Sequence, residues 1–439
     1  MTLERADEIV CLNKNKFVRI ANRKLYILVI KWAKNGMMIE RRPEKITGGT
    51  KMSDTHISDS VFYIGVSDRT LDLFESQYQI PDGVTYNSYV ILDEKTAVLD
   101  TVDVRASEQW LANLEQALAG EPVDYLVISH MEPDHAANIE RFVKLHPEAK
   151  LVGNAKTFGM IRQFFDFDLE NQKVEVKEGD TLNLGKHVLQ FFMAPMVHWP
   201  EVMVTYEQTE KILFSADGFG RFGMMDSETE WGEEAARYYL NIVGKYGVQV
   251  QALLKKAANL DIQIICPLHG PILKDNLEYY LNQYQIWSTY QPEQHGVLIA
   301  YASIHGNTAK VAKRLAEILG EQGEKQVEVL DLSRTDMSFA VRKAFYYDRM
   351  VVAAATYDGG VFPCMEEFLL HIRSKNYQKR TVGIVENGSW APMAGKVIKG
   401  ILESMKEIVI LDPLVTVKSA LKDADLTAMQ ELAGALIKS

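Results

Sequence analysis

Beyond residue 296, short apolar runs alternate with longer stretches in which apolar residues recur every three or four positions. The runs predict strands and the stretches predict helices, because these are the periods of the two structures. Strands are expected at 297–300, 327–330, 350–354, 382–385 and 408–410, and helices at 307–319, 363–373, 393–405 and in a last segment ending near 437. Strict alternation of strands and helices is typical of a doubly wound parallel sheet.

From about 60 to 290 the pattern is less regular and predicts a mixed α/β region. Trp110, Leu114 and Leu118 follow Ser107 at helical spacing, so we expect a helix there with Ser107 as its N-cap. A long helix is also expected over about 232–258. Strands are expected at 86–92, 97–100, 123–128, 173–176, 188–192, 202–206, 212–215 and 262–265. Near 291–295 helix gives way to strand, which predicts a domain boundary.

The first 51 residues differ from the rest in charge. The chain has 48 Lys and Arg residues and 59 Asp and Glu residues. Residues 1–51 hold 12 of the basic and 5 of the acidic residues, a net charge of +7, which leaves a net charge of −18 for the remainder. A polar, turn-rich sequence at 46–51 separates it from Met52. We interpret 1–51 as a basic N-terminal extension and expect Met52 to be the native start; a basic tail with a binding role is the alternative. The domains then expected are 52–291 and 296–439.

Composition argues against several classes of protein. The net charge of −11 argues against a nucleic-acid binder. Cys11, Cys266 and Cys364 are far apart in sequence, which argues against a disulfide framework and against a cysteine-ligated metal site such as that of rubredoxin.

No run approaches the roughly 20 apolar residues of a membrane helix, and the apolar run at 25–30 is too short for a signal-peptide core. We therefore expect a cytoplasmic protein that makes no membrane contact.

A group of potential metal ligands follows the buried strand expected at 123–128. Its members are His130, Glu132, Asp134 and His135. Three further candidates, each just beyond a later strand, are His198, Asp217 and His269. Any one of these residues alone would more often be a turn or capping residue, but loops at the carboxyl ends of strands are where sites are built. Imidazole and carboxylate groups without thiolates suit iron, manganese or zinc.

Three loops at strand ends in the second region carry hydroxyl, glycine and aromatic residues. The first contains Ser303, Ile304, His305, Gly306, Asn307 and Thr308; the second contains Thr356, Tyr357, Asp358, Gly359 and Gly360; the third contains Asn387, Gly388, Ser389 and Trp390. The first loop opens a helix, whose N–H groups and dipole favour a phosphate; simple capping by Asn307 is the alternative. Tyr357 and Trp390 can stack on a flat ring, and glycine permits close approach of the backbone.

The order His-x-Glu-x-Asp-His, followed by a spaced His, Asp and His, resembles the metallo-β-lactamase-like domain of flavodiiron proteins, or A-type flavoproteins. The three later loops resemble the phosphate loop and the two isoalloxazine-contacting loops of flavodoxins. The chain lacks the GxGxxG fingerprint of a dinucleotide site, which favours FMN. The resemblance covers about 55–439. It implies an α/β fold in which a metallo-β-lactamase-like αβ/βα sandwich precedes a flavodoxin-like doubly wound parallel sheet.

The resemblance also implies the roles of the ligands. One iron ion would be bound by His130, Glu132 and His198. The other would be bound by Asp134, His135 and His269, with Asp217 bridging the two. Zinc hydrolases of this superfold usually have His where this chain has Glu132, and the carboxylate favours iron. No catalytic residue is expected beyond these ligands.

The implied activity is reduction of dioxygen to water, of nitric oxide to nitrous oxide, or of both. Dioxygen needs four electrons, which two ferrous ions and reduced FMN would supply together, whereas two molecules of nitric oxide need two. An external donor is expected, such as rubredoxin or an NAD(P)H-dependent reductase, because the chain has no cysteine-ligated iron site. The family arrangement is a head-to-tail homodimer, or a dimer of such dimers, in which the FMN of one subunit faces the irons of the other.

Two other functions compete with this interpretation. A metal-dependent hydrolase with an accessory flavodoxin domain would hold zinc, and Glu132 argues against it. An FMN-binding electron carrier or redox sensor would not need seven metal ligands. His56 and Tyr86 are weaker candidates for the metal pocket, with surface and strand positions as the simpler interpretation, and the two later cysteines are expected to be packing residues.

Overall fold

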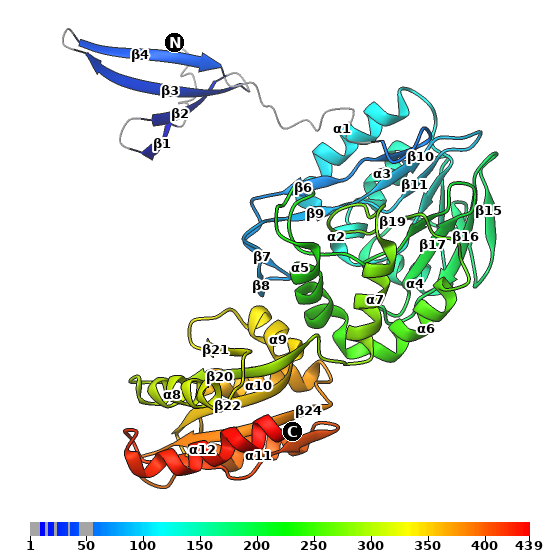
Figure 1. Ribbon diagram of the computed structural model, residues 1–439. Helices are drawn as coiled ribbons and strands as arrows, with labels where there is room; N and C mark the ends of the chain where they lie inside the picture. The colour runs from blue at the N-terminus through cyan, green and yellow to red at the C-terminus, as the bar shows by residue number, and fades with distance from the viewer. Residues whose placement is uncertain (1–8, 14–15, 22–23, 34–35, 44–55) are drawn as a thin grey trace. The chain divides into compact units, whose positions relative to one another are not determined.

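This computed structural model describes residues 9–13, 16–21, 24–33, 36–43 and 56–439. The chain divides into two compact units, Met1–His56 and Ile57–Ser439 (Figure 1). In the first unit the described residues form an antiparallel sheet in chain order. Its strands are β1 (Ile9–Asn13), β2 (Lys16–Ala21), β3 (Lys24–Ala33) and β4 (Gly36–Pro43). The expected native start at Met52 lies outside the described residues.

Two sheets pack face to face in the first part of the second unit. One has the order β14-β13-β12-β11-β10-β5 and the other β15-β16-β17-β18-β19. Their bounds are β5 (Val61–Tyr63), β10 (Tyr89–Ile91), β11 (Ala97–Leu99), β12 (Tyr125–Val127), β13 (Lys150–Gly153), β14 (Lys173–Glu175), β15 (Thr181–Asn183), β16 (Val188–Met193), β17 (Met203–Glu207), β18 (Ile212–Phe214) and β19 (Ile264–Cys266). Buried residues of both sheets, among them Leu99, Val127, Phe191 and Phe214, form one core between them.

Helices and two small two-stranded sheets surround this sandwich. The helices are α1 (Ser107–Leu118), α2 (Pro133–Ala136), α3 (Ile139–Leu145), α4 (Ala155–Phe164), α5 (Trp231–Tyr238), α6 (Gly247–Ala257) and α7 (Leu277–Ser288). One of the small sheets pairs β6 (Val66–Asp68) with β9 (Val84–Tyr86), and the other is the hairpin of β7 (Leu73–Phe74) and β8 (Tyr78–Gln79).

Two helix predictions in this part were wrong in detail. Ser107 is not the N-cap of α1: it is the first helical residue, and its hydroxyl donates to the carbonyl oxygen of Val104 at 2.7 Å. A short 3-10 turn therefore leads into the helix. The long helix expected over 232–258 is interrupted, because a π-helical turn at Tyr239–Val243 and a 3-10 turn at Gly244–Tyr246 separate α5 from α6. The spacing of apolar residues does not reveal such changes of helical pitch. π-Helical turns often occur at functional sites.

The second part is a parallel sheet in the order β21-β20-β22-β24-β25, with β26 also paired to β24. The strands are β20 (Gln294–Ala302), β21 (Val327–Asp331), β22 (Tyr347–Tyr357), β23 (Gly360–Val361), β24 (Arg380–Asn387), β25 (Ile408–Ile410) and β26 (Val415–Val417). The helices are α8 (Asn307–Glu321), α9 (Met337–Tyr346), α10 (Pro363–Ser374), α11 (Ala394–Glu403) and α12 (Asp423–Lys438). Helices α8 and α12 cover one face and α9, α10 and α11 the other (Figure 1). This is the flavodoxin-like strand order, whose switch point is a ligand site.

Buried polar contacts join the two parts within Ile57–Ser439. Arg237 of α5 donates to Ser338 Oγ of α9 at 2.8 Å, and Arg342 of α9 donates to Glu293 at 2.6 Å. Arg380 donates to the carbonyl oxygen of Tyr290 at 2.8 Å. Each guanidinium is nearly fully buried, so removing its partners would leave a buried charge unpaired.

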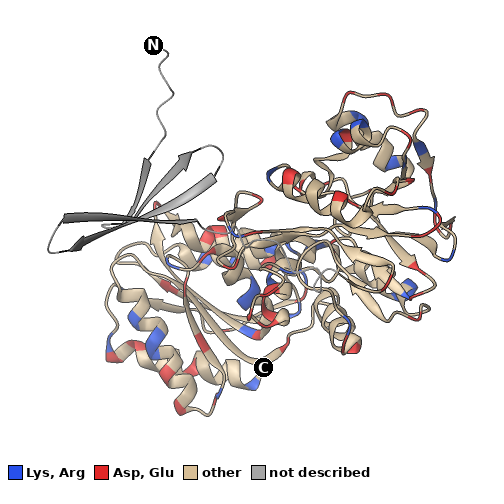
Figure 2. Cartoon of the chain, turned by 90° about the horizontal axis from the view of Figure 1, so that it is seen from above, with Lys and Arg blue, Asp and Glu red and all other residues tan. Residues whose placement is uncertain are grey.

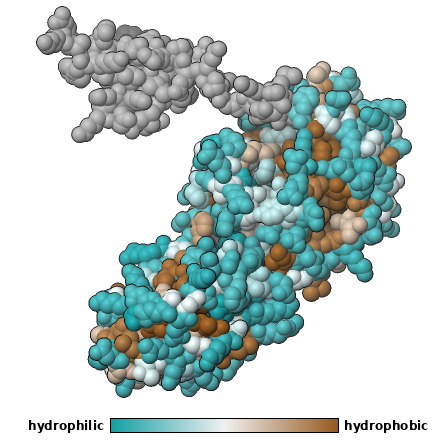
Figure 3. Space-filling view, in the orientation of Figure 1, coloured by the Kyte–Doolittle hydropathy of each residue, from teal (hydrophilic) through white to brown (hydrophobic). Residues whose placement is uncertain are grey.

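The surface of residues 57–439 carries both signs of charge. Figure 2 shows acidic and basic residues interspersed along its helices and loops, and Figure 3 shows a mostly hydrophilic face with smaller apolar patches. Of the helices that the structure describes, none combines the length and the apolar composition that a bilayer crossing requires. Cys266 is buried in the inter-sheet core, as expected for a packing residue, whereas Cys364 is half-buried at the start of α10.

Candidate functional site

Four strand ends bring the seven predicted ligands to one edge of the sandwich. Strands β16, β18 and β19 run in the same direction, because β17 is antiparallel to β16 and β18, and β18 is parallel to β19. His198, Asp217 and His269 follow these three strands. The loop after β12 carries His130 and Glu132, and the short helix α2 that follows it carries Asp134 and His135. A backbone hydrogen bond of 3.1 Å from Met203 N–H to the Ser129 carbonyl oxygen ties this loop to the start of β17. All seven side chains therefore meet in two adjacent groups.

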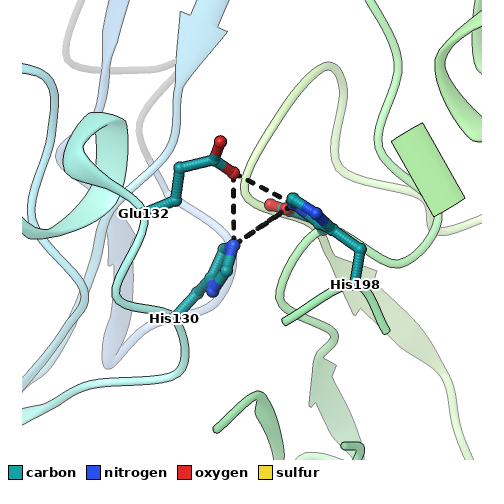
Figure 4. A group of neighbouring side chains, drawn as sticks. His130, Glu132 and His198 are labelled. Carbon is teal, nitrogen blue, oxygen red and sulfur yellow. Dashed lines mark hydrogen bonds and ion pairs between the residues drawn. The ribbon is translucent and has the colours of Figure 1, made fainter. Parts of the chain in front are cut away.

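The first group contains His130, Glu132 and His198, whose side chains point toward one another (Figure 4). Glu132 Oε2 lies 3.0 Å from His198 Nε2 and 3.3 Å from His130 Nε2. The two Nε2 atoms are 3.3 Å apart. Donor atoms placed about 2.1 Å from one cation lie roughly 3.0–3.4 Å from each other. The spacing therefore fits three ligands of a single metal ion.

The second group contains Asp134, His135 and His269. The Nε2 atoms of the two histidines are 3.0 Å apart, and Asp134 Oδ2 lies 3.4 and 3.3 Å from them. Asp217 joins the groups: its Oδ2 is 2.9 Å from His198 Nε2, while its Oδ1 is 3.3 Å from His135 Nε2. Each oxygen of this buried carboxylate thus faces a different group, which is how a carboxylate bridges two cations.

Partners behind the imidazoles fix which nitrogen faces the centre. His130 Nδ1 lies 2.8 Å from Oε1 of Glu201, and His269 Nδ1 lies 2.7 Å from the carbonyl oxygen of Thr85. A carbonyl only accepts hydrogen bonds, and so does an ionised carboxylate, so Nδ1 is the donor in both rings. The lone pair of each Nε2 atom then points into its group. In histidine metal ligands, a hydrogen bond from the other ring nitrogen fixes the ring in the same way.

Unpartnered polar atoms also fit a metal centre. Among the described residues, both carboxylate oxygens of Asp134 and Oδ1 of Asp217 are buried without a hydrogen-bond partner. A buried acceptor left in this state is costly, and coordination to a cation removes the cost. The donor set of imidazole and carboxylate groups suits iron. The residues present therefore fit a pair of iron ions.

The electrostatics of the two groups favour positive charge. Burial alone would lower the pKa of His130, but Asp217, Glu132 and Glu201 outweigh it and hold that pKa well above its usual value. Burial opposes protonation of His198 in the same way, yet Asp217 and Glu132 raise its pKa to about 9. Although burial raises the pKa of Asp217, the neighbouring imidazoles hold it well below its usual range. Metal binding would replace these protons, because histidine binds a metal in its neutral form.

A pocket of about 250 Å³ lies over the two groups, with Glu75, Tyr86, Glu132 and Asp134 in its wall. Tyr86 therefore reaches the pocket from the end of β9, whereas His56 is exposed. The hairpin of β7 and β8 forms one side of the pocket. It places the ring of Phe74 5.3 Å from that of His269 and continues through Glu75 and Ser76 at φ +48° and +57°. Positive φ at both residues lets the three-residue loop 75–77 turn back tightly from β7 to β8.

Tyr238 adds a second wall to the metal site. Its buried ring lies 5.4 Å from that of His269, at the end of α5. Burial, followed by the charge of Asp217, raises the pKa of this phenol well above its usual value. Tyr238 is therefore neutral at physiological pH and keeps a proton to donate.

The three loops of the second part converge on a cleft of about 630 Å³. Thirteen of the fifteen residues predicted for these loops line it: Ser303, Ile304, His305, Asn307, Thr308, Thr356, Tyr357, Asp358, Gly359, Asn387, Gly388, Ser389 and Trp390. Gly306 and Gly360 are not in its wall. Trp390 is 83% exposed and Tyr357 is 44% exposed, so both rings offer faces to a planar ligand.

Backbone geometry at the cleft rules out the alternative of capping by Asn307 and shows a turn that the sequence did not predict. Asn307 is not the N-cap of α8: that position belongs to Gly306, whose φ of +85° suits glycine. The second loop is a tight hairpin, in which Thr356 and Tyr357 belong to β22 and Gly360 to β23. Its turn places Asp358 and Gly359 at φ +47° and +74°.

Several contributing residues escaped prediction from the sequence. Glu201 follows His198 by three positions in the same loop, and that proximity was the available signal. Thr85 acts through its carbonyl group, and Tyr238 lies in an ordinary helical pattern, so neither carries a sequence signal. Ser419 of the cleft exchanges hydrogen bonds of 3.1 and 2.9 Å with Asn387 from across the sheet edge.

Comparisons with known proteins agree with this geometry. Residues 84–270 match the model of the ODP family beta lactamase, and residues 298–408 match that of the flavodoxin domain. The anaerobic nitric oxide reductase flavorubredoxin of Aliivibrio salmonicida is 30% identical over 348 residues, 76% of this chain and 69% of that protein.

Solved structures give the same result. The rubredoxin oxygen:oxidoreductase from Desulfovibrio gigas superposes with a TM-score of 0.82 at 26% identity, covering 88% of this chain and 98% of that one. The flavodiiron protein from Giardia intestinalis superposes with a TM-score of 0.79 at 23% identity, covering 88% and 97%. The fold expected from the sequence is thereby confirmed.

Proposed function

The chain belongs to the flavodiiron protein family, and on that premise we propose that it reduces dioxygen to water, nitric oxide to nitrous oxide, or both. The reaction would take place at two non-haem iron ions, with electrons passed through FMN. Two relatives support both gases: the flavorubredoxin is a nitric oxide reductase, and the Desulfovibrio gigas protein is a rubredoxin oxygen:oxidoreductase.

The observation that carries the proposal is the position of Asp217 between two complete ligand groups. One iron ion would be bound by His130, Glu132 and His198. The other would be bound by Asp134, His135 and His269. Asp217 would bridge them through Oδ2 and Oδ1, which face His198 and His135 respectively. Glu132 at the second position of the motif supports iron over zinc, because a carboxylate is a harder ligand than imidazole.

When bound, the two metals and FMN would supply the electrons and the open coordination positions for the gas. The chain's own residues would do the rest. Glu201 and Thr85 hold two imidazoles in the orientation that metal binding needs. Phe74 and Tyr238 cover His269 with apolar ring surface, which limits access of water to the reduced centre. Tyr238 keeps a proton beside His269, near the site where reduction of dioxygen to water, or of nitric oxide to nitrous oxide and water, would consume protons.

FMN would occupy the cleft of the second part. The phosphate would lie at Ser303, Ile304, His305, Gly306, Asn307 and Thr308, where the first N–H groups of α8 have no intrahelical partner. The ring would lie between the loops containing Thr356, Tyr357, Asp358, Gly359 and Gly360 and those containing Asn387, Gly388, Ser389 and Trp390. The size of the cleft and its two exposed aromatic rings support a mononucleotide there.

Electrons would reach FMN from a separate protein. Rubredoxin is the first candidate, since the Desulfovibrio gigas relative is named for it; an NAD(P)H-dependent reductase is the second. We also propose a head-to-tail homodimer, or a dimer of such dimers, in the cytoplasm. In that arrangement the flavin of one subunit would serve the irons of the other.

The test is gas consumption by protein loaded with iron and FMN. With reduced rubredoxin as donor, the parent should consume dioxygen or nitric oxide at a rate that Asp217→Asn lowers at least about a hundredfold, since this change removes the bridging charge. Asp166→Asn, an exposed position of the same domain, is the matched control and should keep the parental rate. A fully loaded parent that consumed neither gas would refute the proposal and return the hydrolase and the redox sensor to consideration.

A further inference from the structure

A small apolar cavity lies between α6 and the sheet strands β16, β17 and β18. Its outer wall is formed by Leu253, Leu254, Ala257 and Leu260, which are half-buried. The cavity volume is about 20 Å³, close to the minimum that holds one water-sized molecule. The space therefore suits a ligand of two or three atoms.

The polar groups in the wall already have partners. Ser215 Oγ donates to the carbonyl oxygen of Gly218 at 2.6 Å, and the Tyr284 hydroxyl oxygen accepts from the backbone N–H of Phe219 at 2.5 Å. Lys256 lays its methylene groups along the wall, while its ammonium group donates to Glu178 and to the Met193 carbonyl oxygen, both at 2.8 Å. A buried water needs two to four polar partners, and the hydroxyl groups of Ser215 and Tyr284, each already engaged in one hydrogen bond, are the uncharged polar side chains in this wall.

The inner wall is continuous with the metal-binding loops. Val197 directly precedes His198, and Gly218 and Phe219 directly follow Asp217. Residues next to two of the seven predicted ligands therefore line the cavity. The cavity thus lies between the metal loops and the half-buried face of α6.

We propose that this cavity is a binding site for an apolar diatomic gas, and that it supplies the metal centre with its substrate. A gas molecule loses little hydration on leaving water and gains dispersion contacts with a wall that otherwise faces empty space. The identity of the gas as dioxygen or nitric oxide rests on the proposed function. The existence of the binding site does not.

The first test uses krypton, a small apolar atom that crystallography locates by its anomalous scattering. Crystals of the parent, Ala257→Leu and Ala258→Leu are pressurised with krypton. Ala257 lines the cavity and the adjacent Ala258 is exposed, so the two variants add the same side chain inside and outside the site. Krypton should occupy the cavity in the parent and in Ala258→Leu and be absent from Ala257→Leu. An ordered water there, or no krypton in the parent, would overturn the proposal.

A second variant, Leu254→Ala, tests the same cavity in case Ala257→Leu does not fold. This change enlarges the cavity, so krypton occupancy should rise above the parental value. Unchanged occupancy would show that krypton is held elsewhere and would also overturn the site.

The second test addresses the supply of substrate. In Ala257→Leu, KM for the consumed gas should rise at least about twofold, with kcat and the iron and FMN content unchanged, because only delivery of substrate is impaired. Dioxygen and nitric oxide are assayed separately, and Ala258→Leu should match the parent with both. Krypton binding together with an unchanged KM would refute the supply role. Krypton binding by a loaded parent that consumes neither gas would refute the proposed function and leave the cavity as a gas site.

Discussion

Changing Glu201 to Gln removes one negative charge from behind His130 and keeps the size of the side chain. Glu201 is 1% exposed, and its Oε1 accepts hydrogen bonds from His130 Nδ1 at 2.8 Å and from the backbone N–H of Met131 at 2.9 Å. Glutamine keeps one oxygen for these donors but accepts less strongly, because charge-assisted hydrogen bonds are about twice as strong as neutral ones. The imidazole then becomes a less basic and less firmly oriented ligand.

The expected effect on metal affinity follows from the burial of this pair. Loss of an outer carboxylate typically weakens metal binding about 10- to 100-fold, which is about 1.4 to 2.8 kcal/mol. His130 and Glu201 are both buried, so solvent screens their interaction little. We therefore expect Glu201→Gln to weaken binding at the first metal position about 30- to 100-fold.

The assay is anaerobic competition for ferrous iron against a chelator of known affinity. The matched control is Glu207→Gln. Glu207 is also buried and lies 3.0 Å from a histidine nitrogen, His187 Nδ1, but at the far end of β17 from the metal loops. The control should lose stability and keep the parental iron affinity. Equal iron affinity in the two variants would refute the role that we assign to Glu201.

Three further predictions concern the flavin cleft and Asp100, which follows β11 and whose Oδ1 accepts hydrogen bonds from the backbone N–H groups of Ser129 and His130 at 2.7 and 3.3 Å. Gly306→Ala should weaken FMN binding about fivefold or more, because alanine at φ +85° costs about 1–2 kcal/mol. The control is Gly323→Ala, at φ +102° near the other end of α8, which should lower stability without weakening FMN binding. Flavin fluorescence titration measures the binding, and thermal melting measures the stability. Trp390→Ala should weaken FMN binding by about 0.5–1.5 kcal/mol through lost stacking and leave the melting temperature unchanged, since the ring is exposed. Burial raises the pKa of Asp100 to about 6 in the metal-free protein, so its ionisation opposes folding and stability falls as pH rises from about 4 to 6. In urea unfolding, the free energy of Asp100→Asn minus that of the parent should then rise by about 3 kcal/mol between pH 4 and pH 7, and a constant difference would contradict this reasoning.

The seven candidate ligands could be picked from the sequence because they follow recognisable strands, and the structure brings their side chains into two adjacent groups. Strand ends that share an edge bring their following residues together, so spacing in the chain translated into proximity in space. The same logic located thirteen cleft residues. Residues such as Thr85 and Ser419 escaped because they act through backbone atoms or through pairing with a distant loop, and a single sequence carries no mark of either.

Local geometry was harder to predict than the placement of strands. Ser107 and Asn307 have the composition of N-caps, yet the neighbouring Ala106 and Gly306 hold those positions. Helix α1 begins directly after a 3-10 turn, and α8 begins directly after a residue in the left-handed region. Tertiary packing decides at which residue each helix begins. Helix α9 and strand β26 were not expected at all, although both lie in the regular second part.

Single-turnover product analysis tests the central claim most directly. Protein loaded with iron and FMN is reduced anaerobically by four electrons per chain and mixed with dioxygen or, separately, with nitric oxide. The account predicts that each reduced chain consumes one dioxygen without releasing hydrogen peroxide, or converts nitric oxide to nitrous oxide, and that metal-free protein does neither. Release of peroxide as the main product, at the same rate with and without metal, together with no nitrous oxide, would contradict it.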